Sequence, residues 1–272
     1  MFLDVLRNAA SYLTFFFYCA LMFFPVMFLL YLPFSWGLVK ALYWGLMKMS
    51  AKFLLFATFL PVTYQGVNEL PQKPAIFVAN HQSSLDIVLV ASVLGSRSCV
   101  WLSWHRFFEY PFLGQLLNHS GIPVYPKNSS DTSCGGVVQA AVEKLQQGTS
   151  VVLFPEGARY RDGTIHPFFT GFAAMAKLSG APVVPLFISG TGIALPMGSR
   201  MIKRYPLMIT VGKSFVCEPE ESVQAFKERV ESWFIEFNWR RNYLVEYYGI
   251  RICNEMTVLP EGDVNQQHGI VA

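Results

Sequence analysis

His81 and Asp86 stand in the stretch IFVANHQSSLD, with four residues between them and an apolar run directly before them. An imidazole that offers one ring nitrogen to a carboxylate has its tautomer fixed, and its other nitrogen can accept a proton near neutral pH. The pair is therefore a candidate general base. The structural alternative is that Asp86 favours the positive end of a helix while His81 caps that helix or packs against it.

A second stretch, VVLFPEGARYRDG, also places polar residues after an apolar run. Arg159 and Arg161 are candidate phosphate ligands, because a guanidinium binds phosphate through two parallel hydrogen bonds. Gly157 would let the backbone approach a ligand closely, and Glu156 would hold the arginine in place. Lys127 closes a third stretch, GIPVYPK, and adds a cation. Taken singly, these stretches are also explained by a surface turn with an ion pair and by a solvated lysine.

The chain places no residue in the usual setting of a covalent nucleophile. It has no G-x-S-x-G turn, and its glycines near 190–192 and 212–214 match neither a dinucleotide fingerprint nor a P-loop. Its five cysteines are scattered, with no C-x-x-C pair, which argues against a zinc site or a disulfide framework. We therefore expect no metal and no cofactor, and a nucleophile that the substrate supplies.

From residue 61 onward, short apolar runs alternate with amphipathic stretches, which predicts strands that alternate with helices. We predict strands over residues 74–79, 99–104, 122–125, 150–155, 183–188 and 207–211. We predict helices over residues 83–94, 111–118, 132–147, 172–179 and 220–242. This alternation favours an α/β fold with a mixed, largely parallel sheet flanked by helices. Ligands of such sheets bind beyond the carboxyl ends of the strands, where His81 and Glu156 are expected.

The N-terminal segment is apolar enough to meet lipid. No charged residue occurs between Arg7 and Lys40, and residues 12–32 are long enough to cross a bilayer as a helix. Pro25 and Pro33 would kink or end that helix, which leaves both a spanning and a re-entrant course open. A signal peptide fits less well, because the run is too long and no small-residue cleavage site follows it.

Residues 34–60 remain apolar but carry three lysines on one side of a predicted helix, Lys40, Lys48 and Lys52. Such a helix suits a membrane surface with anionic headgroups, and the alternative is a buried helix with a solvated edge. Lysines that follow an apolar segment place the rest of the chain in the cytoplasm. We therefore expect membrane helices over 1–60, a catalytic domain over 61–256 and a flexible polar tail over 257–272. The net charge of +3 argues against nucleic acid as a partner.

Four blocks in fixed order carry a resemblance to a known family. NHQSSLD at 80–86, GIPVYPK at 121–127, FPEGARY at 154–160 and VVPLFI at 183–188 resemble the blocks of the glycerolipid acyltransferases, which include the 1-acylglycerol-3-phosphate acyltransferases. The resemblance implies a membrane-bound α/β acyltransferase that moves an acyl group from acyl-CoA or acyl carrier protein to a lysophospholipid hydroxyl, with phosphatidate as the product.

The resemblance also implies roles for single residues. His81, oriented by Asp86, is implied to be the base that deprotonates the acceptor hydroxyl, so no acyl-enzyme forms. Arg159 is implied to hold the acceptor phosphate, aided by Lys127 and Arg161. Gly157 is implied to leave room for the headgroup, beside Glu156 in the same substrate-binding set.

The chain departs from the family pattern at four places. Ala158 replaces a hydroxyl residue, Lys127 replaces an arginine, no lysine precedes Gly171, and Trp104 stands where a lysine is frequent. Because cations are missing from the implied anion site, another lysolipid or glycerol 3-phosphate stays open as the acceptor. Two other classes of protein stay open. One is a hydrolase that uses the same pair on water, which product analysis would distinguish from a transferase. The other is a catalytically silent lipid-binding module, which the intact His81–Asp86 pair argues against.

Overall fold

The computed structural model describes residues 2–32, 37–111, 113–125 and 134–248 of the 272-residue chain. Pro33, Lys127 and the predicted tail over 257–272 lie outside the described residues. The described residues therefore include the two N-terminal helices and most of the predicted catalytic domain.

The described strands form one sheet with the order β1-β7-β6-β2-β5-β3-β4. The strands are β1 (Val62–Gln65), β2 (Ile76–Ala79), β3 (Cys99–Trp104), β4 (Gly121–Val124), β5 (Ser150–Leu153), β6 (Val183–Ser189) and β7 (Leu207–Val211). Strand β6 pairs with β7 in antiparallel fashion, and every other neighbouring pair is parallel. The predicted mixed, largely parallel sheet is confirmed. Sequence analysis missed β1, whose four residues VTYQ form a half-exposed edge strand with little apolar signal.

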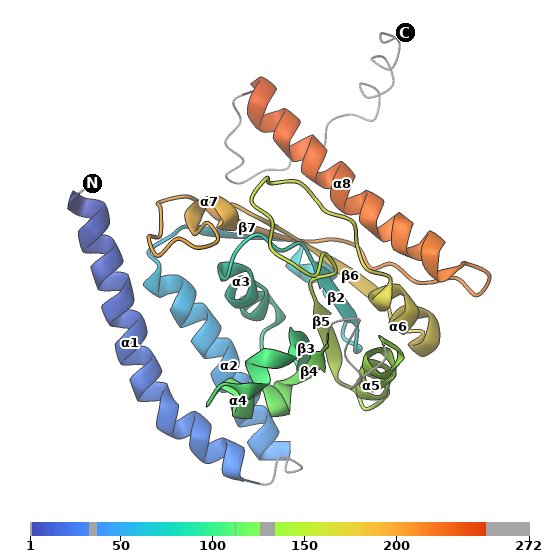
Figure 1. Cartoon of the computed structure of the whole chain (residues 1–272), viewed down its shortest axis with the longest axis horizontal. Coiled ribbons are helices and arrows are strands. Elements are labelled where there is room, and N and C mark those ends of the chain that lie inside the picture. Colours follow the sequence, from blue (N-terminus) through green and yellow to red (C-terminus); the bar gives the residue numbers. More distant parts are fainter. Residues whose placement is uncertain (1, 33–36, 112, 126–133, 249–272) are drawn as a thin grey trace.

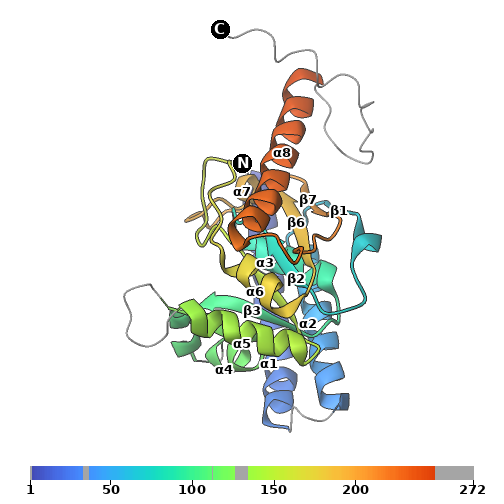
Figure 2. The ribbon, with the colours of Figure 1, turned by 90° about the vertical axis from the view of Figure 1, so that its right-hand side faces the viewer.

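Helices cover both faces of the sheet (Figures 1 and 2). The helices are α1 (Phe2–Tyr31), α2 (Gly37–Ala57), α3 (Leu85–Leu94), α4 (Leu113–Ser120), α5 (Cys134–Gln146), α6 (Gly171–Ser179), α7 (Thr191–Ala194) and α8 (Val223–Tyr248), with 3-10 turns η1 (Val67–Glu69) and η2 (His105–Glu109). Along β2, Phe77 and Ala79 pack into the core shared with α3, while Ile76 and Val78 pack into the core shared with α5, α6 and α8. Because successive side chains of a strand point to opposite faces, a strand buried on both sides must be apolar throughout.

Helix α1 runs without interruption through Pro25. The segment 3–29 is long and apolar enough to cross a membrane, and only 17% of its most apolar 18-residue stretch is buried. The helix packs along α2, where the Tyr18 hydroxyl donates to Ser50 Oγ at 2.8 Å and the Tyr18 ring stacks on Phe53. Of the two effects expected of Pro25, a kink or an end, the end does not occur, since the remaining backbone bonds carry the helix past the one missing N–H.

Helix α2 lies between α1 and the catalytic domain (Figure 1). It contacts α3 more extensively than it contacts α1, and its Leu55 belongs to the core cluster on that face of the sheet. Lys52 is exposed, whereas Lys40 and Lys48 are half-buried. The structure thus favours the buried-helix alternative for this segment, with a partly solvated lysine edge.

Candidate active site

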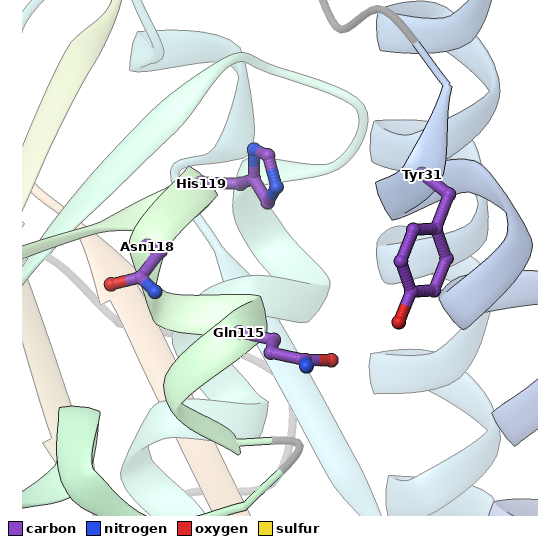
Figure 3. A pocket seen from close by; sticks show the side chains of 4 residues that line it. All are labelled: Tyr31, Gln115, Asn118 and His119. Carbon is purple, nitrogen blue, oxygen red and sulfur yellow. The ribbon is translucent and has the colours of Figure 1, made fainter.

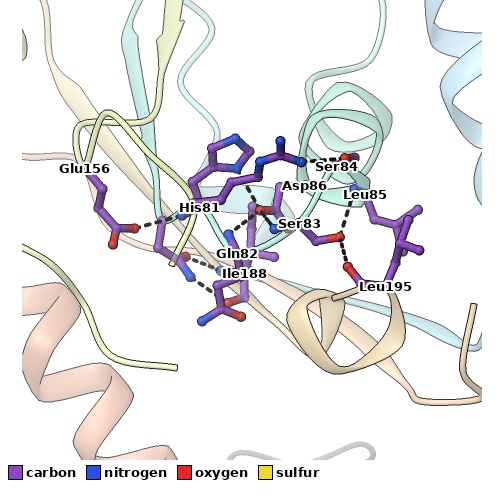
Figure 4. Close-up of polar contacts among 11 residues, drawn as sticks. His81, Gln82, Ser83, Ser84, Leu85, Asp86, Glu156, Ile188 and Leu195 are labelled. Atoms are coloured by element: carbon purple, nitrogen blue, oxygen red, sulfur yellow. Dashed lines mark hydrogen bonds and ion pairs between the residues drawn. The ribbon is translucent and has the colours of Figure 1, made fainter. Parts of the chain in front are cut away.

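His81 lies on the loop between β2 and α3, and Asp86 lies in the first turn of α3 (Figure 4). His81 Nδ1 lies 2.8 Å from Asp86 Oδ2, and the same oxygen accepts the backbone N–H groups of Gln82 at 2.6 Å and Ser83 at 2.7 Å. Asp86 is fully buried at the first turn of α3. Because Oδ2 already accepts two backbone N–H groups, it is also the acceptor toward His81, so Nδ1 donates in this bond and Nε2 is left to accept a proton.

Two further side chains fix the entry to this loop. Asn80 is fully buried and binds the backbone of Ile188 twice, since its Nδ2 donates to the carbonyl at 2.9 Å and its Oδ1 accepts the N–H at 2.7 Å. These bonds continue the β2–β6 pairing past the end of β2. Ser83 Oγ donates to the Leu195 carbonyl at 2.8 Å. Ser83 Oγ also accepts the Leu85 N–H at 3.3 Å, and the Ser84 hydroxyl accepts a bond from Arg159.

The imidazole of His81 lies flat on the ring of Phe154, with ring centres 3.9 Å apart and planes 15° from parallel. Phe154 directly follows β5, the strand next to β2. The His81 side chain is 15% exposed, so the ring is held on one face and on Nδ1 while a small part of it reaches solvent. This packing restricts the imidazole to one orientation, which is a requirement for a general base.

Glu156 does not hold an arginine, contrary to the sequence-based expectation. Its Oε1 accepts the backbone N–H of His81 at 2.8 Å, and its Oε2 accepts the backbone N–H of His166 at 3.0 Å. Burial raises the pKa of the Glu156 carboxyl, and these two hydrogen bonds oppose that rise. Because the carboxylate joins two backbone segments, it positions the loop of His81 and is not turned toward a ligand.

Gly157 also differs from its expected role. Its φ of 72° lies in the left-handed region that glycine adopts without steric cost. A Cβ at this position would come within 2.5 Å of the Phe169 ring. The space beside Gly157 is therefore filled by a side chain of the same loop, and the expected room for a headgroup is absent at this point.

Arg159 lies beside the candidate base, as the sequence predicted for a shared site. Its Nη1 donates to Ser84 Oγ at 2.7 Å, three residues along the chain from His81. Arg161 is exposed, and its guanidinium lies against Gly198, 3.3 Å from the place of a Cβ there. The structure thus brings Arg159 to the loop of His81 and turns Arg161 toward another segment. Lys127, the third predicted cation, lies outside the described residues.

Sequence analysis missed a second histidine–aspartate pair. His166 Nε2 lies 2.8 Å from Asp162 Oδ2 and 3.2 Å from Thr164 Oγ1, and its ring stacks on Tyr160. The H-x4-D spacing that drew attention to His81 is reversed here, as D-x3-H, which a search for the first pattern does not find. Phe154 and Asn80 were missed for a different reason, since an apolar residue and an amide carry no catalytic signal in a sequence.

Neither a metal site nor a reactive thiol stands out in the part of the chain that the structure describes. No three His, Cys, Asp or Glu side chains gather there as a metal would require. Burial raises the pKa of the Cys99 thiol to about 12, so this thiol stays protonated and is a poor nucleophile.

A cavity of about 210 Å³ lies in another part of the molecule (Figure 3). It is lined by Tyr31 from the end of α1 and by Gln115, Asn118 and His119 from α4. None of these residues belongs to the loops that follow β2, β5 or β6. This cavity is therefore separate from the candidate site formed by His81, Asp86 and Arg159.

Fold and side chains together define an α/β protein with a histidine–carboxylate pair and an arginine at the carboxyl edge of its sheet. Residues 61–189, which include this edge, match the family model described as Acyltransferase. This match supports the resemblance to the glycerolipid acyltransferases that the four sequence blocks carry.

Two curated relatives illustrate the match. The chain is 35% identical over 146 residues to the chloroplastic 1-acyl-sn-glycerol-3-phosphate acyltransferase of Brassica napus, which is 53% of this chain and 42% of that protein. It is 29% identical over 124 residues to the 1-acyl-sn-glycerol-3-phosphate acyltransferase of Escherichia coli, which is 43% of this chain and 47% of that protein. The chain thus spans less than half the length of these relatives.

A solved structure shares the fold over nearly the whole chain. The 1-acyl-sn-glycerophosphate (LPA) acyltransferase PlsC from Thermotoga maritima superposes with a TM-score of 0.74 over 88% of this chain and 96% of that one. At 21% sequence identity, this likeness establishes the fold and leaves the chemistry to be argued from the site.

Proposed function

We propose that this protein is a membrane-bound acyltransferase that moves a fatty acyl group from a thioester donor to the free hydroxyl of a lysophospholipid, with 1-acylglycerol 3-phosphate as the acceptor and phosphatidate as the product. The observation that carries the proposal is the loop 81–86, where a buried carboxylate orients His81 while Ser84 binds Arg159. A base on this loop and an anion ligand bonded to the same loop suit an acceptor with a hydroxyl near a phosphate. The two relatives described above are named as acyltransferases for an acceptor of this kind, 1-acyl-sn-glycerol 3-phosphate.

The proposed reaction needs no acyl-enzyme. His81 Nε2 takes the proton of the acceptor hydroxyl as its oxygen forms a bond to the thioester carbonyl carbon. The tetrahedral intermediate then breaks its C–S bond, and the proton on Nε2 passes to the leaving thiolate. Asp86 keeps the imidazole in the required tautomer and stabilises its charged form. General-base help of this kind contributes a rate factor of about 10² to 10⁴.

Positioning of the two substrates contributes at least as much as the base. Arg159 would bind the acceptor phosphate through its guanidinium, and its bond to Ser84 Oγ fixes its distance from His81. Orienting two reactants can lower a barrier by about 7 kcal/mol or more. An acceptor held by its phosphate would thus present its hydroxyl to Nε2 in a fixed position and orientation.

The donor is either acyl-CoA or acyl carrier protein, since both present the same thioester carbonyl. The acceptor and product are lipids, so the site must lie near a bilayer. Helix α1 would supply that contact through its exposed apolar side chains, among them Phe16, Phe24 and Phe28. The lysines of α2 follow α1 in the sequence, which favours a catalytic domain on the cytoplasmic side.

The function is tested with the full chain in detergent, isotope-labelled acyl-CoA or acyl carrier protein, and a panel of lysolipids that includes glycerol 3-phosphate. Mass spectrometry of the products identifies both the reaction and the acceptor. A labelled phosphatidate supports the proposal. Labelled free fatty acid as the main product would show a hydrolase, and a different labelled lipid would correct the acceptor.

A further inference from the structure

The first turns of α1 carry several polar side chains, although the helix is otherwise apolar. Asn8 is 6% exposed, and a buried amide is costly unless its hydrogen bonds are made. Its Oδ1 accepts the backbone N–H of Ile202 at 2.7 Å, and its Nδ2 donates to the Ile202 carbonyl at 3.0 Å. Arg7 donates to the same carbonyl, and the Tyr12 hydroxyl donates to the carbonyl of Arg200. These bonds join positions 188 to 195 residues apart in the chain.

The Asn8–Ile202 pair repeats the geometry of the Asn80–Ile188 pair. In both pairs the amide side chain accepts a backbone N–H and donates to the carbonyl of the same residue. An amide side chain can thus replace a neighbouring strand where no strand is present. Asn80 fixes the loop of His81 in this way. Asn8 fixes residues 195–204, which we call the wall segment.

The wall segment contacts the loop of His81 and the loop that bears Arg159 and Arg161. Its Leu195 carbonyl accepts the bond from Ser83 in the loop of His81. Its Gly198 lies against the guanidinium of Arg161. Its Ile202 packs in the core cluster that contains Leu85 at the start of α3. A shift of this segment would therefore reach the base and the arginine-bearing loop together.

The wall segment is also positively charged. Arg200 and Lys203 are exposed, and the sequence has no acidic residue between Asp162 and Glu218. An exposed positive loop beside a phosphate site raises the local concentration of anionic ligands. The position of this segment should thus affect the binding of an anionic acceptor more than the proton transfer at His81.

We propose that Asn8, assisted by Tyr12, is a positioning residue that holds the wall segment against the acceptor site, so that α1 is a part of this site as well as a membrane contact. The inference rests on the proposed function for its kinetic consequence. Its structural consequence, a wall segment that is fixed by α1, can be measured without any activity.

The experiment compares the full-length wild type in detergent with Asn8→Ala, Tyr12→Phe and the control Ser50→Ala. The control removes a bond between α1 and α2 that does not reach the wall segment. The acceptor is a short-chain 1-acylglycerol 3-phosphate below its micelle concentration, so that membrane attachment does not affect the rate. Acceptor KM and kcat are measured for each variant, together with amide hydrogen exchange of residues 195–204.

We expect the acceptor KM to rise about tenfold in Asn8→Ala, because a buried N–H loses its partner, and about threefold in Tyr12→Phe, which loses one bond. We expect kcat to stay within about twofold. Ser50→Ala should match the wild type. An unchanged KM in Asn8→Ala, or an equal rise in Ser50→Ala, would overturn the inference while leaving the proposed function intact.

If the wild type transfers no acyl group to this acceptor, the proposed function fails, and hydrogen exchange decides the inference alone. Faster exchange of residues 195–204 in Asn8→Ala and Tyr12→Phe, but not in Ser50→Ala, supports the tether. Equal exchange in all four proteins overturns it. Tyr12→Phe removes only a hydroxyl oxygen and keeps the ring, so the test stands even if Asn8→Ala does not fold.

Discussion

Two histidine–aspartate pairs in this structure have the same 2.8 Å separation but different surroundings. In the His81 pair the bond uses Nδ1 and a fully buried carboxylate, whereas in the His166 pair it uses Nε2 and a carboxylate with 51% of its side chain exposed. Water competes for the exposed pair, so its net contribution is small. In addition, Nε2 of His166 is already engaged by Asp162 and Thr164. The two pairs thus leave different ring nitrogens open, Nε2 in His81 and Nδ1 in His166.

The two pairs are nevertheless linked. Each imidazole stacks on an aromatic ring, His81 on Phe154 and His166 on Tyr160. The two oxygens of Glu156 accept the backbone N–H of one histidine each. Pair geometry alone therefore does not define a base. The burial of the carboxylate and the nearby Arg159 set the His81 pair apart, and the second pair provides matched controls for the histidine, its carboxylate and its aromatic neighbour.

The largest effect is expected from His81→Ala, which removes the proposed base. We expect kcat to fall about 10³-fold or more, while His166→Ala stays within about threefold of the wild type. Initial rates of acyl transfer with the full chain in detergent measure both. Comparable losses in the two variants would show that the difference in burial and free nitrogen does not decide function.

Asp86→Asn should lower kcat about 10²-fold, because an amide can present its NH₂ to Nδ1 and then favours the wrong imidazole tautomer. Asp162→Asn, the matched change in the exposed pair, should leave kcat within about twofold. Steady-state rates measured from acid to alkaline pH would test the role of Asp86 further. A normal rate for Asp86→Asn at every pH would assign Asp86 a structural role only.

Phe154→Leu should lower kcat about fivefold to tenfold with little change in either KM, because the imidazole loses the flat surface that restricts its orientation. Phe154→Tyr should restore most of the rate, since it keeps the ring. Tyr160→Leu removes the corresponding stack under His166 and should have no effect on transfer. Rates for the three variants at saturating substrates provide the measurement, and an equal loss in Tyr160→Leu would point to a general effect on the loop.

The smallest effect concerns stability and the carboxylate shared by both pairs. Burial raises the pKa of Glu156 above its usual value of 4.5, so the folded state holds this proton more tightly than the unfolded chain does. The stability from this group is fully present below the unfolded pKa and is lost as pH rises through the folded pKa. The free energy of unfolding of the wild type minus that of Glu156→Gln should therefore fall with rising pH over this window.

Denaturant unfolding of both proteins in detergent, repeated at several pH values above and below 4.5, measures this difference. A difference that rises with pH would mean that the hydrogen bonds from His81 and His166 outweigh burial.

Most of the order of elements in the catalytic domain was predictable because most elements have a local signal. The apolar runs at 99–104 and 207–211 became β3 and β7 with the predicted bounds. Alternation of strands and helices also placed His81 and Glu156 at the carboxyl ends of strands. The polar residues of β1 gave no such signal, and Pro25 left open whether α1 would kink or end, because a helix packed along another tolerates a single missing hydrogen bond.

By itself, the sequence determined which residue types could do chemistry and on which edge of the sheet they would stand, since both follow from patterns within a few residues. The tertiary structure decided which partner each residue meets: Asn80 with Ile188, Glu156 with two backbone N–H groups, and Asn8 with Ile202. The physical reason is that a hydrogen bond between residues up to 194 positions apart depends on how whole elements pack, and no local pattern records that packing.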